Sequence, residues 1–241
     1  MAAELQSTSE GLTMVLTISN PEHRNALGPE IYAAGVEALN AAESSAEVRS
    51  VVIAGEGAVF SAGGNLQRLQ ANRQQPPEIQ ARSIEGLHNW IEAIRTFPKP
   101  VIAAVEGPAA GAGFSLALAC DFIIAATNAV FVMAYSNIAL SPDGGGSWSL
   151  SKALPRPLVN ELLMCGERIG AERLHQLGLV NRITEHHPDQ PRSSGAVNQV
   201  IGDSKAFQQR AVFFSRKFRH TISCVWFSLF NAPRIKWLLN F

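Results

Sequence analysis

The sequence predicts an α/β protein in which buried parallel strands alternate with helices. Residues 51–54 and 100–105 are continuous apolar runs rich in β-branched side chains, which is typical of strands buried on both faces of a parallel sheet. Residues 29–42 and 84–97 instead repeat apolar side chains at helical spacing. With 241 residues, 46% of them hydrophobic, the chain is long enough to form one sizeable core.

The first half of the chain predicts two strands and two helices around one polar segment. Residues 12–18 predict a strand that ends before Asn20-Pro21, and residues 29–42 predict a helix with Ile31, Val36 and Leu39 on one face. After the strand at 51–54, residues 66–80 are rich in Gln, Asn, Arg and Pro, a composition that favours a mobile loop. A helix over 84–97 then ends at the prolines that follow it.

The second half predicts further alternation of strands and helices. A helix is expected from residue 114 to 120, strands over 122–126 and 130–133, and helices over 158–165 and 171–177. Residues 1–185 therefore predict one core region.

Two glycine-rich turns follow two of the predicted strands. Residues 60–66 read Phe-Ser-Ala-Gly-Gly-Asn-Leu, and residues 107–113 read Gly-Pro-Ala-Ala-Gly-Ala-Gly directly before a predicted helix. If each turn presented a backbone amide to one carbonyl oxygen, the pair would form an oxyanion hole able to stabilise an enolate. Close helix packing at the glycines is an alternative. A phosphate site is a weaker one, because the Walker and dinucleotide-binding patterns are both missing.

A single carboxylate lies on a third glycine-rich segment, Ser141-Pro142-Asp143-Gly144-Gly145-Gly146. A carboxyl held between apolar segments can take up and return a proton near neutral pH, which a proton shuttle requires. The alternative is a β-turn in which Asp and Gly serve the geometry alone. Asp143 is the candidate catalytic residue.

Several motifs in order resemble one known family. They are Asn-Pro-Glu-His-Arg-Asn-Ala-Leu at 20–27, the turn at 60–66, the segment at 99–107, Cys120-Asp121 and Gly-Leu-Val-Asn at 178–181. Together they resemble the enoyl-CoA hydratase/isomerase (crotonase) superfamily over residues 11–184. The resemblance implies an α/β crotonase-like (ClpP/crotonase) spiral of ββα repeats with a C-terminal helical region. It also implies assembly as a homotrimer or hexamer and binding of an acyl-CoA thioester.

The resemblance also assigns roles to residues. It implies that the amides of Ala62 and Ala112 hold the thioester oxygen. Arg24 is the first candidate to contact the CoA phosphates, with a solvated surface charge as the alternative. No metal and no cofactor other than the substrate's coenzyme A is implied. The remaining candidate substrate-binding residues are Ala26, Gly63, Gly64, Asn65, Leu66, Gly111, Ser115 and Tyr135.

Departures from the family pattern point to the reaction. Hydratases of this family use two glutamates, and this chain has Ser115 and Tyr135 at those positions. Neither is a carboxylate base at pH 7, since a serine hydroxyl has no useful pKa and tyrosine titrates at about 10. Asp143 falls where isomerases and dehalogenases of the family keep one acid. The resemblance therefore implies an enoyl-CoA isomerase that shifts a double bond by proton transfer. A dehalogenase, a hydratase or thioesterase, and a CoA-thioester-binding protein without turnover stay open as alternatives.

Composition limits the setting. A net charge of zero argues against a nucleic-acid surface, and no apolar run is long enough to span a membrane. The start of the chain shows neither a basic leader nor an apolar signal core. Cys120, Cys165 and Cys224 have no metal-binding or redox spacing. A reducing cytoplasm is the expected location.

Residues 186–241 differ in composition from the rest of the chain. From residue 203 onward seven Lys and Arg residues face the single acid Asp203, and aromatic side chains gather. This atypical basic and aromatic region predicts a divergent helical cap. A segment that contacts a membrane surface or partner, and an altered terminus from a shifted reading frame, are the alternatives.

Overall fold

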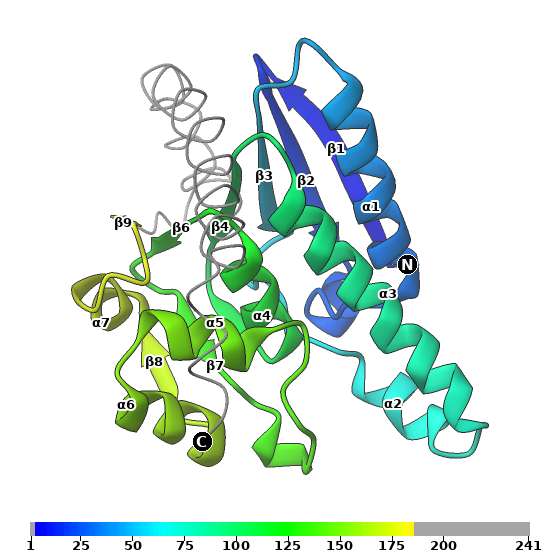
Figure 1. The fold of residues 1–241 in the computed structure, drawn as a ribbon, viewed down its shortest axis with the longest axis vertical. Helices are drawn as coiled ribbons and strands as arrows, with labels where there is room; N and C mark the ends of the chain where they lie inside the picture. Colours follow the sequence, from blue (N-terminus) through cyan, green and yellow to red (C-terminus); the bar gives the residue numbers. More distant parts are fainter. Residues whose placement is uncertain (1–2, 186–241) are drawn as a thin grey trace, which may run out of the picture.

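The computed structural model describes residues 3–185, and Figure 1 shows their arrangement. Six strands form the main sheet in the order β1-β2-β3-β4-β6-β9, with β1 and β2 antiparallel and all later neighbours parallel. A smaller sheet has the order β5-β7-β8. The strands of the main sheet are β1 Glu4–Glu10, β2 Thr13–Ser19, β3 Ser50–Gly55, β4 Val101–Val105, β6 Phe122–Ala126 and β9 Arg182–Thr184. Those of the smaller sheet are β5 Pro108–Ala110, β7 Val130–Val132 and β8 Arg168–Gly170.

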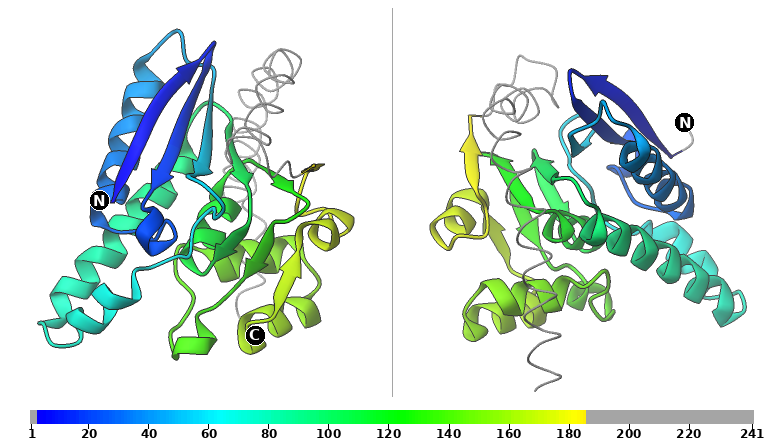
Figure 2. Two further views of the ribbon diagram at one scale, coloured as in Figure 1. Left: turned by 180° about the vertical axis from the view of Figure 1, so that it is seen from behind. Right: turned by 45° about the horizontal axis from the view of Figure 1, so that its top comes forward.

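Helices flank the two sheets. The α1 helix packs on β1 and β2 and, on its other side, against α3, so that the two long helices lie next to each other (Figures 1 and 2). The α-helices are α1 Pro29–Ser44, α2 Leu66–Asn72, α3 Pro77–Thr96, α4 Ala112–Ala119, α5 Gly146–Ala153, α6 Arg156–Asn160 and α7 Ala171–Gln176. Shorter turns are the 3₁₀ helices η1 Pro21–His23 and η2 Ser136–Ile138 and the π-helix η3 Glu161–Cys165.

The hydrophobic core occupies both faces of the main sheet. Alternate residues of β3 divide between two clusters: Val51 and Ile53 join the larger one, and Val52 and Ala54 the smaller. The larger cluster takes in the inner faces of α1 and α3 and the whole of Trp90, which is fully buried. Parallel strands buried on both faces explain the unbroken apolar runs in the sequence.

Most of the predicted elements are confirmed. The strand expected at 12–18 is β2, the helix at 29–42 is α1, and the strands at 51–54 and 100–105 are β3 and β4. The helix predicted from 114 is α4, which begins two residues earlier, and the segment 171–177 is α7. The strands β1, β8 and β9 were not predicted.

The prediction of a loop over residues 66–80 is wrong. This segment forms α2 and the start of α3, so the helix predicted at 84–97 begins earlier, at Pro77. The Asn65 side chain accepts a hydrogen bond from the Arg68 amide and caps α2. Pro77 occupies the first turn of α3, where its missing N–H costs nothing. Local capping therefore outweighs the polar composition.

Two further predictions need correction. The turn expected at 107–113 contains the short strand β5, which pairs with β7. The single helix expected at 158–165 is instead the end of α6 followed by the π-helix η3. The predictions for residues 186–241, including the helical cap, lie outside the described residues.

Candidate functional site

The two glycine-rich turns are joined by backbone hydrogen bonds. The Ser61 amide donates to the Pro108 carbonyl at 3.2 Å, and the Ala110 amide donates to the Ser61 carbonyl at 2.9 Å. These bonds form a short parallel bridge between the exit of β3 and β5. The turns predicted to share one ligand atom therefore do lie side by side.

Glycine is required where the two turns touch. Gly63 has φ +85°, and a Cβ there would lie 2.6 Å from the Ala110 carbonyl oxygen and 3.1 Å from the Ala112 amide nitrogen. A Cβ on Gly113 would lie 2.7 Å from the Ser61 carbonyl oxygen. Because real Cβ atoms do not approach backbone oxygen so closely, any side chain at either position would push the turns apart. The amide of Ala112 therefore depends on Gly63 for its place beside the first turn.

The amide of Ala62 is already engaged. It donates to the carbonyl of Arg24 at 3.0 Å. The amides of Gly64 and Ala112, in contrast, donate to no acceptor within residues 3–185. The structure therefore does not support Ala62 as a free oxyanion donor: its N–H fixes the position of the preceding loop. Gly64, predicted only as a substrate-binding residue, carries the available amide of the first turn.

A buried asparagine holds the Arg24 carbonyl in position. Asn25 has φ +55° and is 1% exposed. Its side-chain amide donates to the Glu56 and Val59 carbonyls at 2.8 and 2.6 Å, and its Oδ1 accepts the Asn20 amide at 3.0 Å. The hydroxyl of Ser61 completes the arrangement by donating to the Asn25 carbonyl at 2.8 Å. This network fixes residues 20–27 against the turn at 60–66.

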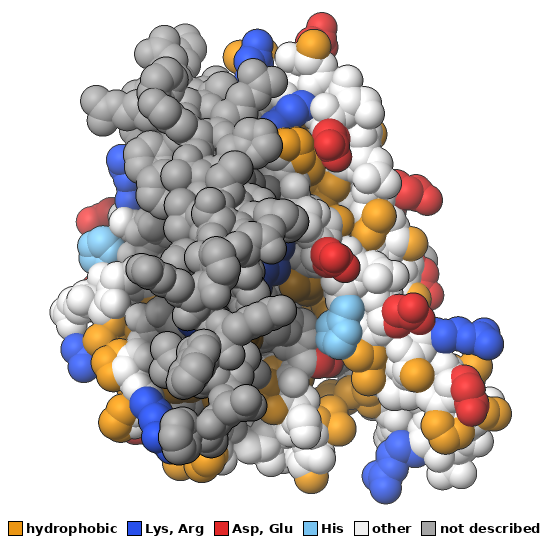
Figure 3. Space-filling model, viewed as in Figure 1, with side chains coloured by type: hydrophobic (Ala, Val, Ile, Leu, Met, Phe, Trp, Pro, Cys, Tyr) orange, Lys and Arg blue, Asp and Glu red, His pale blue; other side chains and the backbone are white. Residues whose placement is uncertain are grey.

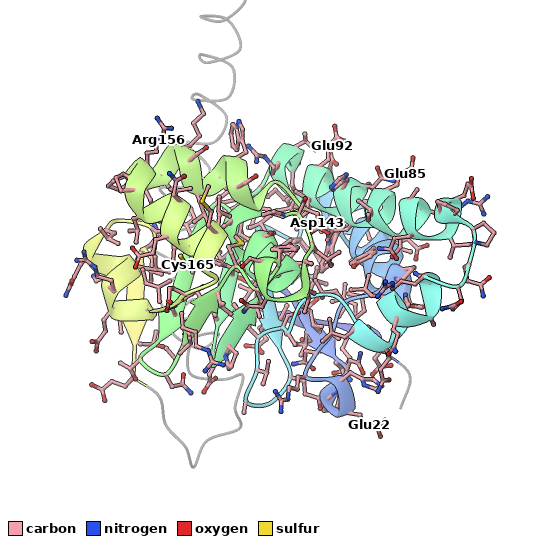
Figure 4. All side chains as sticks on the ribbon, turned by 90° about the horizontal axis from the view of Figure 1, so that it is seen from below. Glu22, Glu85, Glu92, Asp143, Arg156 and Cys165 are labelled. Atoms are coloured by element: carbon pink, nitrogen blue, oxygen red, sulfur yellow. The ribbon has the colours of Figure 1, made fainter. Side chains whose placement is uncertain are left out.

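Asp143 is half-buried, on the loop that precedes α5. In Figure 4 it lies among the central elements, whereas the labelled side chains of Glu22, Glu85, Glu92 and Arg156 lie at the periphery. Gly144 and Gly145 have φ of +57° and +72°, values that favour glycine. Residues 141–146 therefore form a turn that needs its glycines, and the same turn carries the carboxylate.

Glycine also lets the Asp143 loop pack closely on its neighbours. A Cβ on Gly144 would lie 3.0 Å from Cβ of Ser115 and 3.7 Å from side-chain carbons of Leu87 and Ile91. Ser115 lies on α4, and the other two lie on α3. The carboxylate is thus presented on a loop pressed between two helices, with apolar side chains of α3 beside it.

Two hydroxyl groups contact Asp143. The Tyr135 hydroxyl donates to Oδ1 of Asp143 at 2.6 Å, and the Ser115 hydroxyl donates to the Asp143 backbone carbonyl at 3.0 Å. The two hydroxyls lie 3.3 Å apart. Ser115 is fully buried and Tyr135 is 6% exposed. Both were predicted to bind substrate, and in the structure the Tyr135 hydroxyl contacts the carboxylate of Asp143 and the Ser115 hydroxyl its backbone carbonyl.

Tyr32 of α1 is a site neighbour that the sequence did not reveal. Burial raises the pKa of Tyr32, and the negative charge of Asp143 raises it further. Burial, then the charge of Asp143 and the hydrogen bond to it, likewise raise the pKa of Tyr135. Both phenols therefore keep their protons through the neutral range. Only the fold could reveal this, since α1 and the Asp143 loop are far apart in the sequence.

The other predicted binding residues divide into exposed and structural ones. Arg24 is exposed, with φ +52°, and Leu66 is 58% exposed at the start of α2. Ala26 is 5% exposed, and its carbonyl accepts the side-chain amide of Asn20. Asn65 uses its side chain to cap α2. Gly111, with φ +51°, precedes α4 and lies 3.8 Å from the Tyr135 ring, measured from the position that its Cβ would take.

The exposed surface of α1 and α3 is acidic. Figure 3 shows red side chains along this flank, and the exposed acids of the two helices are Glu30, Glu37, Glu43, Glu78, Glu85 and Glu92. Arg82 and Arg95 are also exposed on α3, so the acids outnumber the cations on this surface. Within residues 3–185, no group of His, Cys, Asp and Glu side chains is arranged to hold a metal ion. No described helix is both long and apolar enough to cross a membrane.

The site thus combines two backbone amides, of Gly64 and Ala112, that are free within the described residues, and the Asp143 carboxylate, on a loop that contacts Ser115 of α4. Comparison with known proteins identifies the family. The enoyl-CoA hydratase/isomerase family model matches residues 8–211. The chain belongs to this family and has the α/β crotonase fold.

Individual relatives differ in their named activity. The chain is 36% identical over 173 residues to the 1,2-epoxyphenylacetyl-CoA isomerase of Escherichia coli K12, a match that covers 71% of this chain and 66% of that protein. It is 36% identical over 184 residues to the carnitinyl-CoA dehydratase of Salmonella enteritidis, covering 76% of this chain and 69% of that protein. The match thus spans about two thirds of these relatives.

A solved structure is similar over more of the chain. An enoyl-CoA hydratase from Polaromonas sp. JS666 is 64% identical, with a TM-score of 0.84 over 91% of this chain and 83% of that one. The family and the fold are therefore established, whereas isomerase, dehydratase and hydratase names all occur among the relatives.

Proposed function

We propose that this protein is an acyl-CoA isomerase that moves a double bond by shuttling one proton through Asp143. The observation that carries the proposal is the single carboxylate beside two free amides, with no second carboxylate in the hydratase positions. A hydratase must position and activate water, which its family members do with two glutamates. Here those positions hold Ser115 and Tyr135, and both contact Asp143.

The proposed reaction converts a 3-enoyl thioester into a 2-enoyl thioester. One carboxylate oxygen of Asp143 takes a proton from C2, and the electrons of that C–H bond delocalise over C2, C4 and the thioester oxygen. The same carboxyl returns the proton to C4 as the double bond forms between C2 and C3. Atoms and electrons balance without a further reactant, and one acid is sufficient for both steps.

The amides of Gly64 and Ala112 are the proposed oxyanion donors. Both are free within the described chain, and Gly63 allows the second turn to approach the first. Ala112 is also the first residue of α4, where the unpaired amides and the helix dipole favour negative charge. The dienolate oxygen would gain two hydrogen bonds that strengthen as charge develops, and each such donor contributes about 3 to 4 kcal/mol to the barrier reduction.

The coenzyme A moiety is proposed to enter from the side of Arg24. On the exposed surface of α1 and α3 the acids outnumber Arg82 and Arg95, which disfavours the phosphates of CoA there. Arg24 is exposed on the loop whose carbonyl holds the Ala62 amide. Assembly into a homotrimer or hexamer and a cytoplasmic location remain part of the proposal.

A proton-exchange assay tests the function directly. Purified protein is incubated with 3-enoyl-CoA or 2-enoyl-CoA in deuterated water, beside Asp143→Asn, and deuterium entry and product are followed by mass. We expect exchange and a double-bond shift in the wild type and a loss of about 10³-fold or more in Asp143→Asn, because the only proton carrier is removed. Titration of both proteins with CoA thioesters shows whether binding survives the substitution.

The alternatives predict other results. Water addition that persists in Asp143→Asn would assign the protein to the hydratases. Thioester binding without exchange in the wild type would favour a binding protein without turnover, which the missing glutamates also allow.

The amide assignment has a separate test. In ¹⁵N-labelled Asp143→Asn, the amides of Gly64 and Ala112 should move downfield when butyryl-CoA binds and less when its thioether analogue, which lacks the carbonyl, binds. The amide of Ala62 should respond alike to both ligands. A carbonyl-dependent shift at Ala62 instead would restore the assignment made from the sequence.

A further inference from the structure

The two tyrosines of this chain are far apart in the sequence, and the negative charge of Asp143 raises the pKa of both. The sequence contains two Tyr residues, Tyr32 and Tyr135. The charge of Asp143 acts on both phenols. Only Tyr135 forms a hydrogen bond with the carboxylate, at 2.6 Å to Oδ1. The pair therefore offers a natural comparison between a phenol that holds the acid and one that lies near it.

We infer that Tyr135 is a positioning residue that fixes the orientation of the Asp143 carboxylate for proton transfer. The inference rests on the proposed isomerase function for its catalytic consequence. It reassigns a residue expected to contact substrate: Tyr135 acts through Asp143 and not on the acyl group.

The geometry of the contact supports a fixed orientation. Tyr135 is 6% exposed, and its ring lies beside Gly111, at the start of α4. Its hydroxyl lies 3.3 Å from that of Ser115, which donates to the Asp143 backbone carbonyl at 3.0 Å. Side chain and backbone of Asp143 are thus held from two elements. No other donor within residues 3–185 reaches the carboxylate, so Oδ2 is left for the substrate proton.

The Tyr135 hydroxyl donates its hydrogen bond to the Asp143 carboxylate, which determines how its removal acts on that group. A hydroxyl that donates to a carboxylate stabilises the ionised form more than the protonated form. Other charged groups near the loop are few: Arg95 of α3 lies 3.9 Å from the position that a Cβ on Gly145 would take, and Glu85 and Glu92 lie on the exposed side of α3 (Figure 4). Removing the Tyr135 hydroxyl therefore leaves the carboxylate with less stabilisation and greater rotational freedom.

Kinetics provide the first test. In Tyr135→Phe, we expect kcat at neutral pH to fall at least tenfold with KM changed less than threefold, because substrate contacts remain while the carboxylate loses its fixed orientation. Tyr32→Phe is the matched control, because Tyr32 forms no hydrogen bond with Asp143 within the described residues, and its kcat should change less than threefold. A raised KM with unchanged kcat in Tyr135→Phe would instead return Tyr135 to substrate binding.

A measurement without turnover separates this inference from the proposed function. Protein labelled with 3-fluorotyrosine gives one ¹⁹F signal per tyrosine, and Tyr32→Phe assigns them. Between pH 3 and 8, the signal of residue 135 should follow the titration of one carboxyl, and Asp143→Asn should abolish that step. A signal that does not respond to Asp143→Asn overturns the inference, whether or not the protein is an isomerase. If the step is present but the wild type exchanges no substrate proton, the proposed function fails and the Tyr135 contact stands.

Discussion

The two halves of the site are built in different ways. The amide half, at residues 24–27 and 61–65, is held by backbone hydrogen bonds and by the buried side chain of Asn25. The acid half, at residues 135–146, depends on two hydroxyls that contact Asp143. Both halves meet at the first turn of α4, where Ala112 and Ser115 are three residues apart and so lie on the same face of the helix. The amide half should therefore be sensitive to changes of backbone shape, and the acid half to the loss of single side-chain atoms.

The largest loss of activity is expected from Gly63→Ala, because Gly63 has no room for a side chain whereas the neighbouring Gly64 has. Gly63→Ala places a Cβ 2.6 Å from the Ala110 carbonyl oxygen at φ +85°, so the turns must separate. We expect activity to fall about 10²- to 10³-fold, the scale of a lost oxyanion donor. Gly64→Ala is the control, since its Cβ would meet only a Leu69 methyl at 3.7 Å and its N–H is kept. Steady-state kinetics of both variants check this, and equal losses would contradict the division of roles.

The side-chain hydrogen bonds of Asn25, which hold the amide half in place, should contribute to the free energy of unfolding. Asn25→Ala removes two donors from the Glu56 and Val59 carbonyls and places alanine at φ +55°. The free energy of unfolding should fall by about 3 kcal/mol, from unpaired buried carbonyls and left-handed strain. Urea denaturation measures this, with Asn89→Ala on the exposed side of α3 as the control, expected within about 0.5 kcal/mol of wild type. A loss under 1 kcal/mol for Asn25→Ala would show that the loop is held by other contacts.

The smallest effect concerns the acid half at alkaline pH. Burial and Asp143 raise the pKa of Tyr32 in the folded protein, so the unfolded chain loses the phenolic proton first, from about pH 10 upward. The stabilisation is full below that pH and is lost as pH rises, by up to about 1.4 kcal/mol per pH unit for each buried tyrosine. Tyr32→Phe should make the free energy of unfolding less dependent on pH in this range, because one fewer proton is released on unfolding. Denaturation at pH 9 to 11 tests it, and identical slopes for wild type and variant would argue against a buried, neutral Tyr32.

Sequence patterns predicted the sheet and the principal helices because parallel strands buried on both faces leave unbroken apolar runs. The same patterns failed for α2, where the composition of residues 66–72 indicated a loop although Asn65 is a residue type favoured at helix N-caps. The strand β1 is exposed along most of its length and so has no apolar period to detect.

For the site, Asp143 and the two turns were recognisable because glycines surround them. The choice between the Ala62 and Gly64 amides was not, since it depends on the Arg24 carbonyl, 38 positions earlier in the sequence, which accepts a hydrogen bond from the Ala62 amide. The contact between Tyr135 and Asp143 could not be predicted either. A tyrosine at this position shows only that the hydratase glutamate is absent, and not which group the tyrosine contacts. Tyr32 approaches Asp143 solely through the packing of α1.

The close packing of Gly146 on Ser115 has an evolutionary consequence. A Cβ on Gly146 would collide with the Ser115 hydroxyl, so the Asp143 loop rests directly on that small side chain. A glutamate at position 115, following the direction of the present hydroxyl, would occupy the space of the loop. Restoring the first hydratase glutamate alone would therefore disturb the existing acid before a second glutamate could complete a water site. Under the proposed function, a change from isomerisation to hydration would therefore require a new conformation of this loop.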